Sequence, residues 1–361
     1  MGPEVLDDVL ARRARAQGLT GPGFADVPQA VRALLAVQAQ DAPLARWSLS
    51  LRTGGPDDAA VRAAVDDGHV VRTHVLRPTW HYVSVEDVRW LLDLTGPKVL
   101  RSMAGRTRRL GLGDPAVLRR EVDRLLATLA DTPLTRRQVA AAVGRDDLAG
   151  ERLGQVIGIA ELEGLVCSGP HVNGQHTYTL LDERVAPAPA KDRDDAVREL
   201  VLRFFTGHGP ASAAQLARWC TLTQREVRAA VADLGDALAT IEVDGVDHWY
   251  GADAAGPDPA EGAFLLPVFD EAYLTYPGSN LPRLPDHPWG TGHSSFAEAG
   301  GGVVVHGRRD VGWWKRKDAG RTTTVSLGLA RSLPAPARAE VEDQAAALAA
   351  FTGRELRLVS A

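Results

Sequence analysis

Gln38 lies where the sequence predicts the apolar face of a helix, and Gln40 follows two residues later. In the segment VRALLAVQAQDAPLARW (31–47) apolar residues recur at helical spacing, and Gln38 occupies the next position on that face. An amide there must find hydrogen-bond partners, because an unsatisfied buried amide costs about 1–3 kcal/mol. Since helical positions i and i+2 do not face each other, both glutamines can point into one site only if the helix loosens. Pro43 disfavours helical geometry at Ala42, which predicts that the helix ends here.

The chemistry open to a pair of glutamines is limited. A glutamine carbonyl oxygen can hold a water molecule, and the NH2 group can donate to a phosphate or a sugar, but neither group is a strong base. On its own, a Gln-Ala-Gln tripeptide is a weak signal. An ordinary frayed polar helix end is then the simpler interpretation.

Three further polar residues are candidates for a supporting role. Arg77, Thr79 and His81 alternate along RTHVLRPTWHYV (72–83), so on a strand all three side chains share one face. They either support the glutamines or contact a phosphate. The alternative, slightly favoured, is a polar ladder with a structural role only.

Two other groups of polar residues are candidates for catalysis or for metal binding. Asp270 and Glu271 in FDEAY form a candidate carboxylate pair, although a structural role beside the tyrosines of the same segment is favoured. His171 and His176 lie in a predicted turn, with no cysteine or carboxylate at ligand spacing. We therefore predict no metal site and no cofactor.

The elements that must position these residues form a pattern that occurs three times. Three helices are followed by a short pair of strands, which is the order of a winged helix. In the clearest copy, helices are predicted at 117–131, 136–144 and 151–165, with Gly144 closing the second, and a strand pair at 166–181. The next copy ends in two strands around a tight Asp-Gly turn. From about Gly262 the sequence changes to short β-like runs, a closing helix and a last strand.

These patterns predict an α+β protein with three tandem winged helices and a C-terminal β-rich α+β region. A proline-rich linker, APAPAKDRDD, precedes the third copy. The predicted domains are a first winged helix with the glutamines at 1–95, a second at 96–185, a third at 186–258, and the C-terminal region with a basic hairpin at 259–361.

The third helix of each copy is expected to act as scaffold. A winged helix usually places its third helix in the major groove of DNA. Here the third helices carry acidic residues, which would be repelled by phosphates, and Glu161 and Glu163 are expected to be exposed on one of them. Another carries Asp57, Asp58, Asp66 and Asp67. A simple transcription factor is therefore disfavoured.

Composition sets outer limits on the function. Of 361 residues, 45% are apolar and 24% charged, as in ordinary globular proteins. The net charge of −5 argues against a nucleic-acid partner, but residues 101–120 hold six arginines against one aspartate and residues 307–321 hold six Lys or Arg against two aspartates. No apolar leader and no run near the ~18 residues of a membrane span is present, so no membrane association is predicted. Cys167 and Cys220 are too few for a disulfide framework or a zinc site and favour a reducing cytoplasm.

Four segments together resemble the AlkZ/YcaQ winged-helix superfamily of DNA glycosylases. They follow in the family's order, and the resemblance runs from about residue 5 to 355. The segments are LLAVQAQDAPLARWSLSLR, VVRTHVLRPTWHYVSVEDVRWLL, FLLPVFDEAYLTY and VVVHGRRDVGWWKRK. Gln-x-Gln is the AlkZ-type form of the catalytic motif, whereas the other branch has an acidic second residue. The resemblance implies that Gln38 and Gln40 are the catalytic pair and that the winged helices surround a concave DNA-binding channel.

The resemblance also directs attention to VVVHGRRDVGWW (303–314). Two β-like runs flank a turn at 306–310, which predicts a hairpin with a cationic tip, and the family implies a DNA-probing hairpin in this part of the chain. An arginine in a narrow minor groove gains from the negative potential there. Trp313 and Trp314 are expected to pack in the core, and an edge hairpin with solubilising charges is the alternative. The candidate DNA contacts are His306, Arg308, Arg309, Lys315 and Arg316.

The implied reaction agrees with what two amides can do. A purine alkylated at N7 is cationic, so its leaving group needs no protonation, and the enzyme must place a water and stabilise charge on the sugar. The expected function is therefore a monofunctional DNA glycosylase acting on N7-alkylated purines in double-stranded DNA, with interstrand crosslinks as further substrates. A crosslinked base cannot swing into a deep pocket, so an open cleft is expected. No cofactor and no obligate protein partner is expected. The family suggests self-resistance to a DNA-alkylating natural product as a setting, in the cytoplasm and at the nucleoid when bound to DNA.

Two alternatives remain open on the sequence alone. A non-catalytic DNA-binding regulator would leave alkylated DNA intact and prefer one unmodified sequence. A protein-interaction scaffold would show no salt-dependent affinity for DNA, whereas contacts to several phosphates would weaken steeply with salt.

Overall fold

The computed structural model describes residues 2–55, 57–143, 150–258, 262–276, 281–286 and 300–360. They divide into two compact units. The first unit comprises Met1–Val61, Leu202–Gln215 and Leu234–Ala361, and the second comprises Arg62–Val201 and Leu216–Asp233. Helices and strands occur in both units, which confirms the α+β class.

The glutamine segment lies between two short helices of the first unit, after α1 (Pro3–Ala16). Helix α2 (Val27–Leu34) begins at Asp26, whose side chain accepts a hydrogen bond from the Gln29 N–H. It ends because Leu35 adopts φ 65°, a left-handed conformation that a helix cannot continue. The predicted helix through position 38 is therefore wrong, since Gln38 lies in the extended strand β1 (Val37–Gln38).

Pro43 also has a different role from the one that the sequence predicts. It lies in the first turn of α3 (Ala42–Ser50), where the missing N–H of a proline leaves no hydrogen bond unmade. The Asp41 carboxylate caps this helix by accepting from the Leu44 N–H at 3.1 Å. The proline therefore starts a helix instead of ending one.

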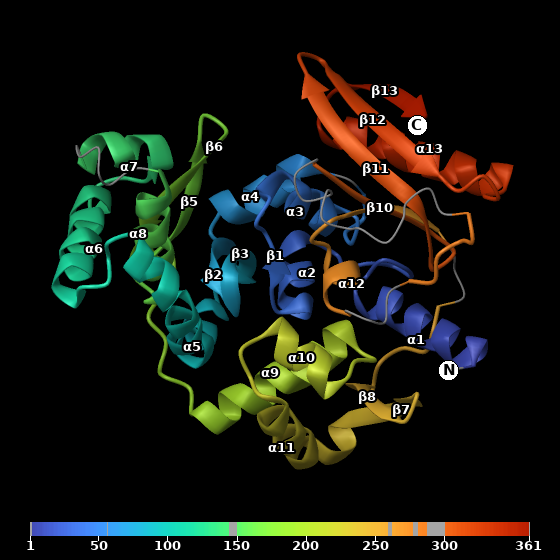
Figure 1. The fold of residues 1–361 in the computed structure, drawn as a ribbon, viewed down its shortest axis with the longest axis horizontal. Coiled ribbons are helices and arrows are strands. Elements are labelled where there is room, and N and C mark those ends of the chain that lie inside the picture. Colours follow the sequence, from blue (N-terminus) through green and yellow to red (C-terminus); the bar gives the residue numbers. More distant parts are fainter. Residues whose placement is uncertain are drawn as a thin grey trace. The chain divides into compact units, whose positions relative to one another are not determined.

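A five-stranded sheet forms most of the C-terminal region, as the β-like runs predict (Figure 1). Its order is β13-β12-β11-β10-β9, antiparallel except for the parallel pair β12–β13, which α13 connects. Side chains of α13 pack on the sheet beside Trp47 of α3, whose Nε1–H donates to the Leu265 carbonyl at 2.8 Å. The helix that follows the glutamines is thus fixed to the C-terminal sheet. The elements are β9 (Ala263–Pro267), β10 (Gly301–His306), β11 (Arg309–Ala319), β12 (Thr322–Leu329), α13 (Ala335–Phe351) and β13 (Glu355–Ser360).

The rest of the first unit comes from the middle of the chain. The strands β7 (Leu238–Val243) and β8 (Val246–Gly251) pair around Asp244 and Gly245, both with positive φ, which confirms the predicted tight turn. The short helix α12 (Glu271–Leu274) follows β9. Three helices are each divided between the two units: α9 (Arg193–His208), α10 (Ala213–Trp219) and α11 (Gln224–Leu234).

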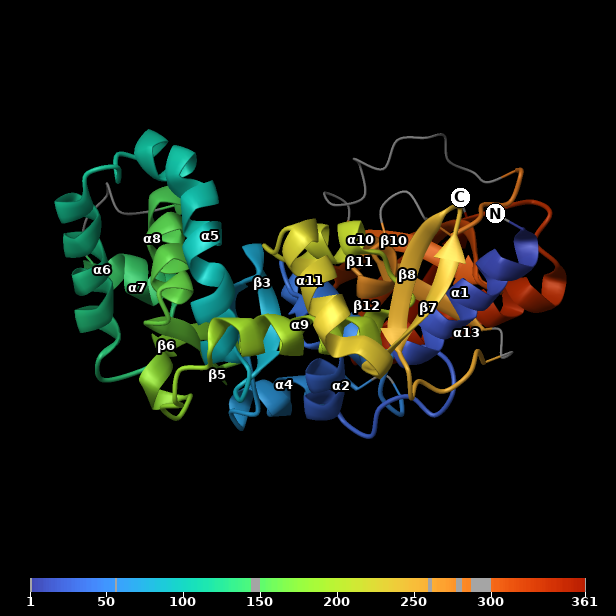
Figure 2. The same ribbon diagram turned by 90° about the horizontal axis from the view of Figure 1, so that it is seen from below.

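The second unit contains the segment predicted as the clearest copy of the pattern. Three helices precede a β-hairpin there (Figure 2). The apolar faces of these helices share one hydrophobic core. This order of elements is the predicted one, while Gly144 and position 259 lie outside the described residues and the division into four domains stays a prediction. The elements are α4 (Asp58–Asp66, shared with the first unit), β2 (Val70–Val75), β3 (Arg77–Ser84), α5 (Val88–Arg109), α6 (Pro115–Leu129), β4 (Leu134–Thr135), α7 (Arg136–Val143), α8 (Gly150–Leu162), β5 (Val166–Val172) and β6 (Gln175–Leu180).

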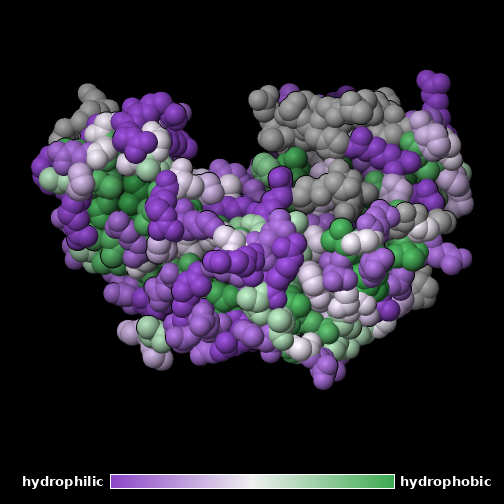
Figure 3. All heavy atoms as spheres, turned by 60° about the horizontal axis from the view of Figure 1, so that its bottom comes forward, coloured by the Kyte–Doolittle hydropathy of each residue, from purple (hydrophilic) through white to green (hydrophobic). Residues whose placement is uncertain are grey.

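The surface is mixed in character. Hydrophilic side chains are spread over the face drawn in Figure 3, with smaller hydrophobic areas between them. Among the described residues the large exposed hydrophobics are four separate valines, and single residues of this kind are common on protein surfaces. Among the helices that the structure describes, none combines the length and the apolar character needed to cross a bilayer.

Candidate active site

The two glutamines differ in their exposure to solvent. Gln38 is 6% exposed and the intervening Ala39 is fully buried, whereas Gln40 is exposed. The extended backbone at Gln38 removes the need for a loosened helix, because alternate residues of an extended segment can point to the same side. A buried amide beside an exposed one offers one group held by the protein and one that a substrate can reach.

The backbone before Gln38 is held by the C-terminal end of α9. The Leu34 carbonyl accepts a hydrogen bond from His208 Nε2 at 2.9 Å, which fixes the proton of this imidazole on Nε2. Gly207 permits this approach, because a Cβ there would lie 2.3 Å from the Ala33 carbonyl oxygen. The His208 carbonyl in turn accepts from the Tyr276 hydroxyl at 2.6 Å.

Glu271 contacts the glutamine motif directly. Its side chain is fully buried, and Oε1 accepts from the Gln38 backbone N–H at 2.9 Å. The other oxygen accepts from the Thr275 hydroxyl at 3.1 Å. A carboxylate that accepts a backbone N–H makes a charge-assisted hydrogen bond, so it fixes the strand that carries Gln38 more firmly than a neutral acceptor would.

Asp270 and Glu271, which the sequence indicates as a candidate carboxylate pair, have different partners in the structure. Asp270 accepts from Arg52 Nη1 at 2.9 Å and Nη2 at 2.7 Å, and from the Ser48 hydroxyl at 2.6 Å. It also caps α12 by accepting from the Ala272 N–H. The favoured structural role is therefore right for Asp270, but the sequence reasoning missed the contact of Glu271 with the motif. The signal in the sequence that could have indicated the contact of Glu271 is the occurrence of two adjacent carboxylates directly after an apolar strand.

The predicted strand face of Arg77, Thr79 and His81 exists in β3 of the second unit. His81 is fully buried, and this burial, together with nearby Arg77, holds its pKa well below the usual range. The neutral ring donates from Nδ1 to the Thr79 carbonyl at 2.9 Å and accepts at Nε2 from Arg77 Nη2 at 3.1 Å. Arg77 also donates to the Trp219 carbonyl. These contacts favour the polar ladder, and a role in supporting the glutamines stays a prediction.

The expected exposure of Glu161 is wrong. Glu161 is fully buried on α8, where its carboxylate contacts His74 Nδ1 and accepts from Trp80 Nε1 at 3.3 Å. Gly158 on the same helix lets the His74 ring approach. Only Glu163 is exposed, so the argument from repulsion by phosphates holds for that residue and not for Glu161.

The predicted basic hairpin is formed by β10 and β11. His306 pairs with Arg309, and Gly307 and Arg308 make the two-residue turn with φ 54° and 58°. The tip is less free than its sequence indicates, because Arg308 makes two 3.0 Å hydrogen bonds to the Asp7 carboxylate. Its side chain is 12% exposed, whereas Arg309 is exposed.

The other hairpin residues also have partners. His306 Nε2 lies 3.2 Å from a Glu340 carboxylate oxygen, and the Lys315 ammonium lies 5.4 Å from the centre of the Trp313 ring. Trp314 is fully buried, and its Nε1–H donates to the Leu266 carbonyl at 3.0 Å, which confirms its place in the core.

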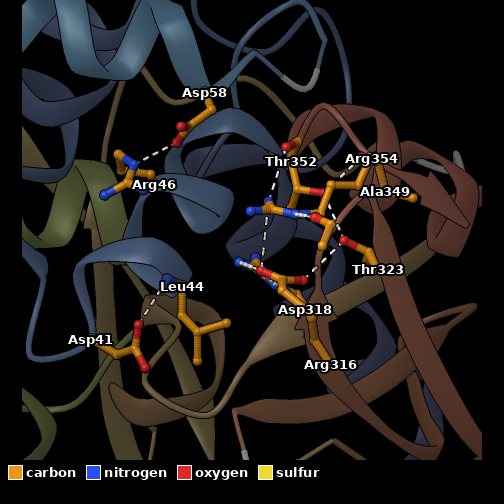
Figure 4. Close-up of polar contacts among 11 residues, drawn as sticks. Asp41, Leu44, Arg46, Asp58, Arg316, Asp318, Thr323, Ala349, Thr352 and Arg354 are labelled. Carbon is orange, nitrogen blue, oxygen red and sulfur yellow. Dashed lines mark hydrogen bonds and ion pairs between the residues drawn. The ribbon is translucent and has the colours of Figure 1, made fainter. Parts of the chain in front are cut away.

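Arg316 belongs to a polar cluster at the far end of β11 (Figure 4). It donates to Asp318 from Nε at 3.1 Å and from Nη2 at 2.8 Å, while Arg354 lies 3.7 Å from the same carboxylate. Partial burial raises the pKa of Asp318, whereas the hydrogen bonds from Arg316 and Thr323 lower it. The pKa of Asp318 therefore lies below its usual value. Of the five candidate DNA contacts, Arg309 is therefore the most accessible.

His171 and His176, the two histidines of the predicted turn, lie in different environments. His171 contacts Asp66 at 2.8 Å, and burial lowers the pKa of His176 to about 3. Among the residues that the structure describes, no group of three or more His, Cys, Asp or Glu side chains is placed to hold a metal ion.

Comparisons with known proteins show what this chain is similar to. A family model described as "DNA glycosylase AlkZ-like" matches residues 31–351. An interstrand DNA cross-link repair glycosylase from Streptomyces sahachiroi is 28% identical over an alignment of 373 positions, and the alignment covers 96% of this chain and 96% of that one. The solved structure of Streptomyces sahachiroi DNA glycosylase AlkZ has a TM-score of 0.73 at 22% identity and covers 98% of this chain and 99% of that one. The structural similarity shows that the two chains share a fold.

Proposed function

Because the chain belongs to the DNA glycosylase AlkZ-like family, we propose that it hydrolyses the N-glycosidic bond of purines alkylated at N7, including those that link two DNA strands. The relative named for interstrand cross-link repair supports the second part. The observation that carries the proposal is the Gln38–Gln40 motif, in which the Gln38 side chain is buried and the Gln38 backbone N–H is bonded to Glu271, while the Gln40 side chain is exposed.

In this proposal the glutamines act without a strong acid or base. The cationic base leaves unprotonated, one amide carbonyl holds the attacking water, and amide dipoles stabilise the positive charge that develops on the sugar. The product is free alkylated base and an abasic site. An unmodified base is a much poorer leaving group, so selectivity comes from the lesion's own chemistry.

DNA contacts are proposed for the hairpin. The exposed Arg309 is directly available to phosphates or to the minor groove, whereas a contact from the partly exposed Lys315 requires that its ammonium leave the Trp313 ring. Contacts from His306, Arg308 and Arg316 require exchange of Glu340, Asp7 and Asp318 for phosphate oxygens. We also propose that the enzyme acts in the cytoplasm, at the nucleoid when bound, because its substrate is DNA, and that it needs no obligate protein partner.

The test is a glycosylase assay on defined duplexes. Purified protein is incubated with one duplex carrying a single N7-alkylguanine, a matched unmodified duplex, and one with an N7–N7 interstrand crosslink, and abasic sites are then cleaved by alkali. We expect strand cleavage of the N7-alkylguanine duplex and of the crosslinked duplex, whose strands also become separable, and no cleavage of the unmodified duplex. Protein that binds these duplexes and leaves several different adducts intact would make the chain a DNA-binding regulator.

Replacement of Glu271 tests whether the anchor of Gln38 affects catalysis. Glu271→Ala removes the acceptor for the Gln38 N–H, and we expect kcat to fall about tenfold or more with a smaller change in KM, because reacting groups misplaced by a fraction of an ångström lose rate. Glu271→Gln keeps a carbonyl acceptor and is expected to retain most of the rate. Equal losses of kcat in both variants would count against an anchoring role.

A further inference from the structure

The turn between α2 and β1 has a strained backbone. At Leu35 the backbone angles are φ 65° and ψ −45°, and the Leu34 carbonyl accepts a hydrogen bond from the Ala36 N–H at 2.7 Å. A three-residue turn of this kind, with positive φ at its central residue, is the rare and strained form of the γ-turn. Strained turns persist only where surrounding contacts hold them, and they are frequent at functional sites. This turn directly precedes the strand that carries Gln38.

A glycine would adopt this conformation without strain, but the sequence has a leucine. The Leu35 side chain is fully buried, and its burial stabilises the fold in a way that a glycine could not. The apolar side chain therefore comes with a backbone conformation that is unfavourable for leucine. Other contacts must balance the strain at this position.

The C-terminal end of α9 contacts the carbonyl groups at which α2 ends. Arg203 Nη2 donates to the Arg32 carbonyl at 2.7 Å. His208 Nε2 donates to the Leu34 carbonyl at 2.9 Å, so this oxygen accepts one hydrogen bond from within the turn and one from α9. The last carbonyls of a helix have no partner within that helix, and a partner on a second element satisfies them. His208 is thus bonded directly to the strained turn.

His208 is itself fixed by its surroundings. It is fully buried, and its ring stacks on Phe204 with the ring centres 4.9 Å apart and 18° between the planes. The His208 carbonyl accepts from the Tyr276 hydroxyl at 2.6 Å, and Gln17 Nε2 donates to the same hydroxyl at 2.7 Å. Burial raises the pKa of Tyr276 above its usual value, so the hydroxyl keeps its proton and remains a donor. Both the ring and the backbone of His208 are therefore held in place.

We propose that His208 is a positioning residue for base release. Its Nε2–H holds the strained turn at Leu35, and this turn sets the direction in which the chain carries Gln38 and Gln40. The inference rests on the proposed function, in which these two amides place the water and stabilise charge on the sugar. With the bond from Glu271 to the Gln38 N–H, the segment is held at two points. Without the bond at the turn, the backbone relaxes, and amides displaced by a fraction of an ångström lose rate.

Two substitutions separate the hydrogen bond of His208 from the packing of its ring. His208→Phe keeps an aromatic ring beside Phe204 and removes the donor, whereas His208→Gln keeps an N–H donor in place of Nε2. We expect His208→Phe to lower kcat for base release from N7-alkylguanine DNA about tenfold or more, with KM changed less than about twofold, and His208→Gln to recover most of kcat. His208→Met takes the place of His208→Phe if the latter does not fold.

The matched control is the other buried histidine of the first unit that donates to a carbonyl. His248 is 5% exposed and donates from Nδ1 to the Val246 carbonyl at 3.0 Å. His248→Phe also removes a buried donor, but it leaves the contact between α9 and the turn unchanged. We expect its kcat to match that of the parent protein within about twofold.

Hydrogen–deuterium exchange measured without DNA tests the turn itself. The reporters are the Ala36 N–H, bonded within the turn, and the Gln38 N–H, bonded to Glu271. We expect these amides to exchange about tenfold faster or more in His208→Phe, and at the parental rate in His208→Gln and His248→Phe. Exchange needs no activity, so it reports on the turn even if the parent protein releases no base.

The outcomes distinguish this inference from the proposed function. An active parent protein with parental kcat in folded His208→Phe, or with unchanged exchange in that variant, would overturn the positioning role and leave the proposed function standing. Equal losses of kcat in His208→Phe and His208→Gln would also overturn it, since the packing of the ring would then be what matters. A parent protein that releases no alkylated base would overturn the proposed function and the positioning role together.

Discussion

Gln38→Ala is expected to reduce the single-turnover rate of base release from N7-alkylguanine DNA by about 100-fold or more, if its amide stabilises the transition state as an oxyanion-hole donor does. The side chain is nearly buried, where a dipole acts through a low dielectric and is pre-oriented by its surroundings. Gln40→Ala is expected to show a loss of the same order. Because Gln40 is exposed, its loss should also affect KM through contacts with the sugar or phosphate.

The control for these variants is an exposed glutamine elsewhere. Gln224 lies on α11, where its side chain accepts from Arg228, and Gln224→Ala should retain the parent rate within about twofold. Circular dichroism and melting temperature check that each variant is folded. Near-parental rates in both Gln38→Ala and Gln40→Ala would remove the motif from the mechanism, and the water would have to be held by other groups.

Local patterns were sufficient to predict much of the framework. The period-two spacing of Arg77, Thr79 and His81 agrees with β3, because side chains on a strand alternate between its two faces. The valine-rich run before Gly307 and Arg308 predicts the hairpin of β10 and β11, and the three helices before β5 were also recognisable by their spacing. These features depend on neighbours within a few residues, which a sequence displays directly.

The details of the site depend on contacts between distant residues. The end of α2 is set by a leucine in a left-handed conformation, which no propensity predicts, and Gln38 therefore lies on a strand. Glu161 is buried because of His74, 87 positions away, and Glu271 reaches the Gln38 backbone across 233 positions. A helical pattern shows that a carboxylate lies on one face, but not whether a partner covers that face.

The largest expected change in stability follows from the ion pair of Arg52 and Asp270. Both side chains are fully buried, and the pair is joined by Ser48 and by Gln17, which accepts from Arg52 at 3.1 Å. Asp270→Ala leaves the guanidinium buried without its carboxylate, and removal of one partner of a buried pair costs about 3–5 kcal/mol. We expect the midpoint of chemical unfolding of the first unit to fall accordingly, as followed by tryptophan fluorescence, to which Trp47 and Trp314 in its core contribute.

Two comparisons separate the lost ion pair from a general effect of mutation. The exposed pair of Arg321 and Glu355, in the same unit, provides the control, since Glu355→Ala should leave the midpoint nearly unchanged. The double variant Arg52→Met with Asp270→Leu removes both charges, and we expect it to be more stable than Asp270→Ala alone because no uncompensated charge remains. If Asp270→Ala unfolds at the same denaturant concentration as Glu355→Ala, the buried pair does not hold α12 in place. The anchoring of Gln38 through Glu271 on that helix would then need another explanation.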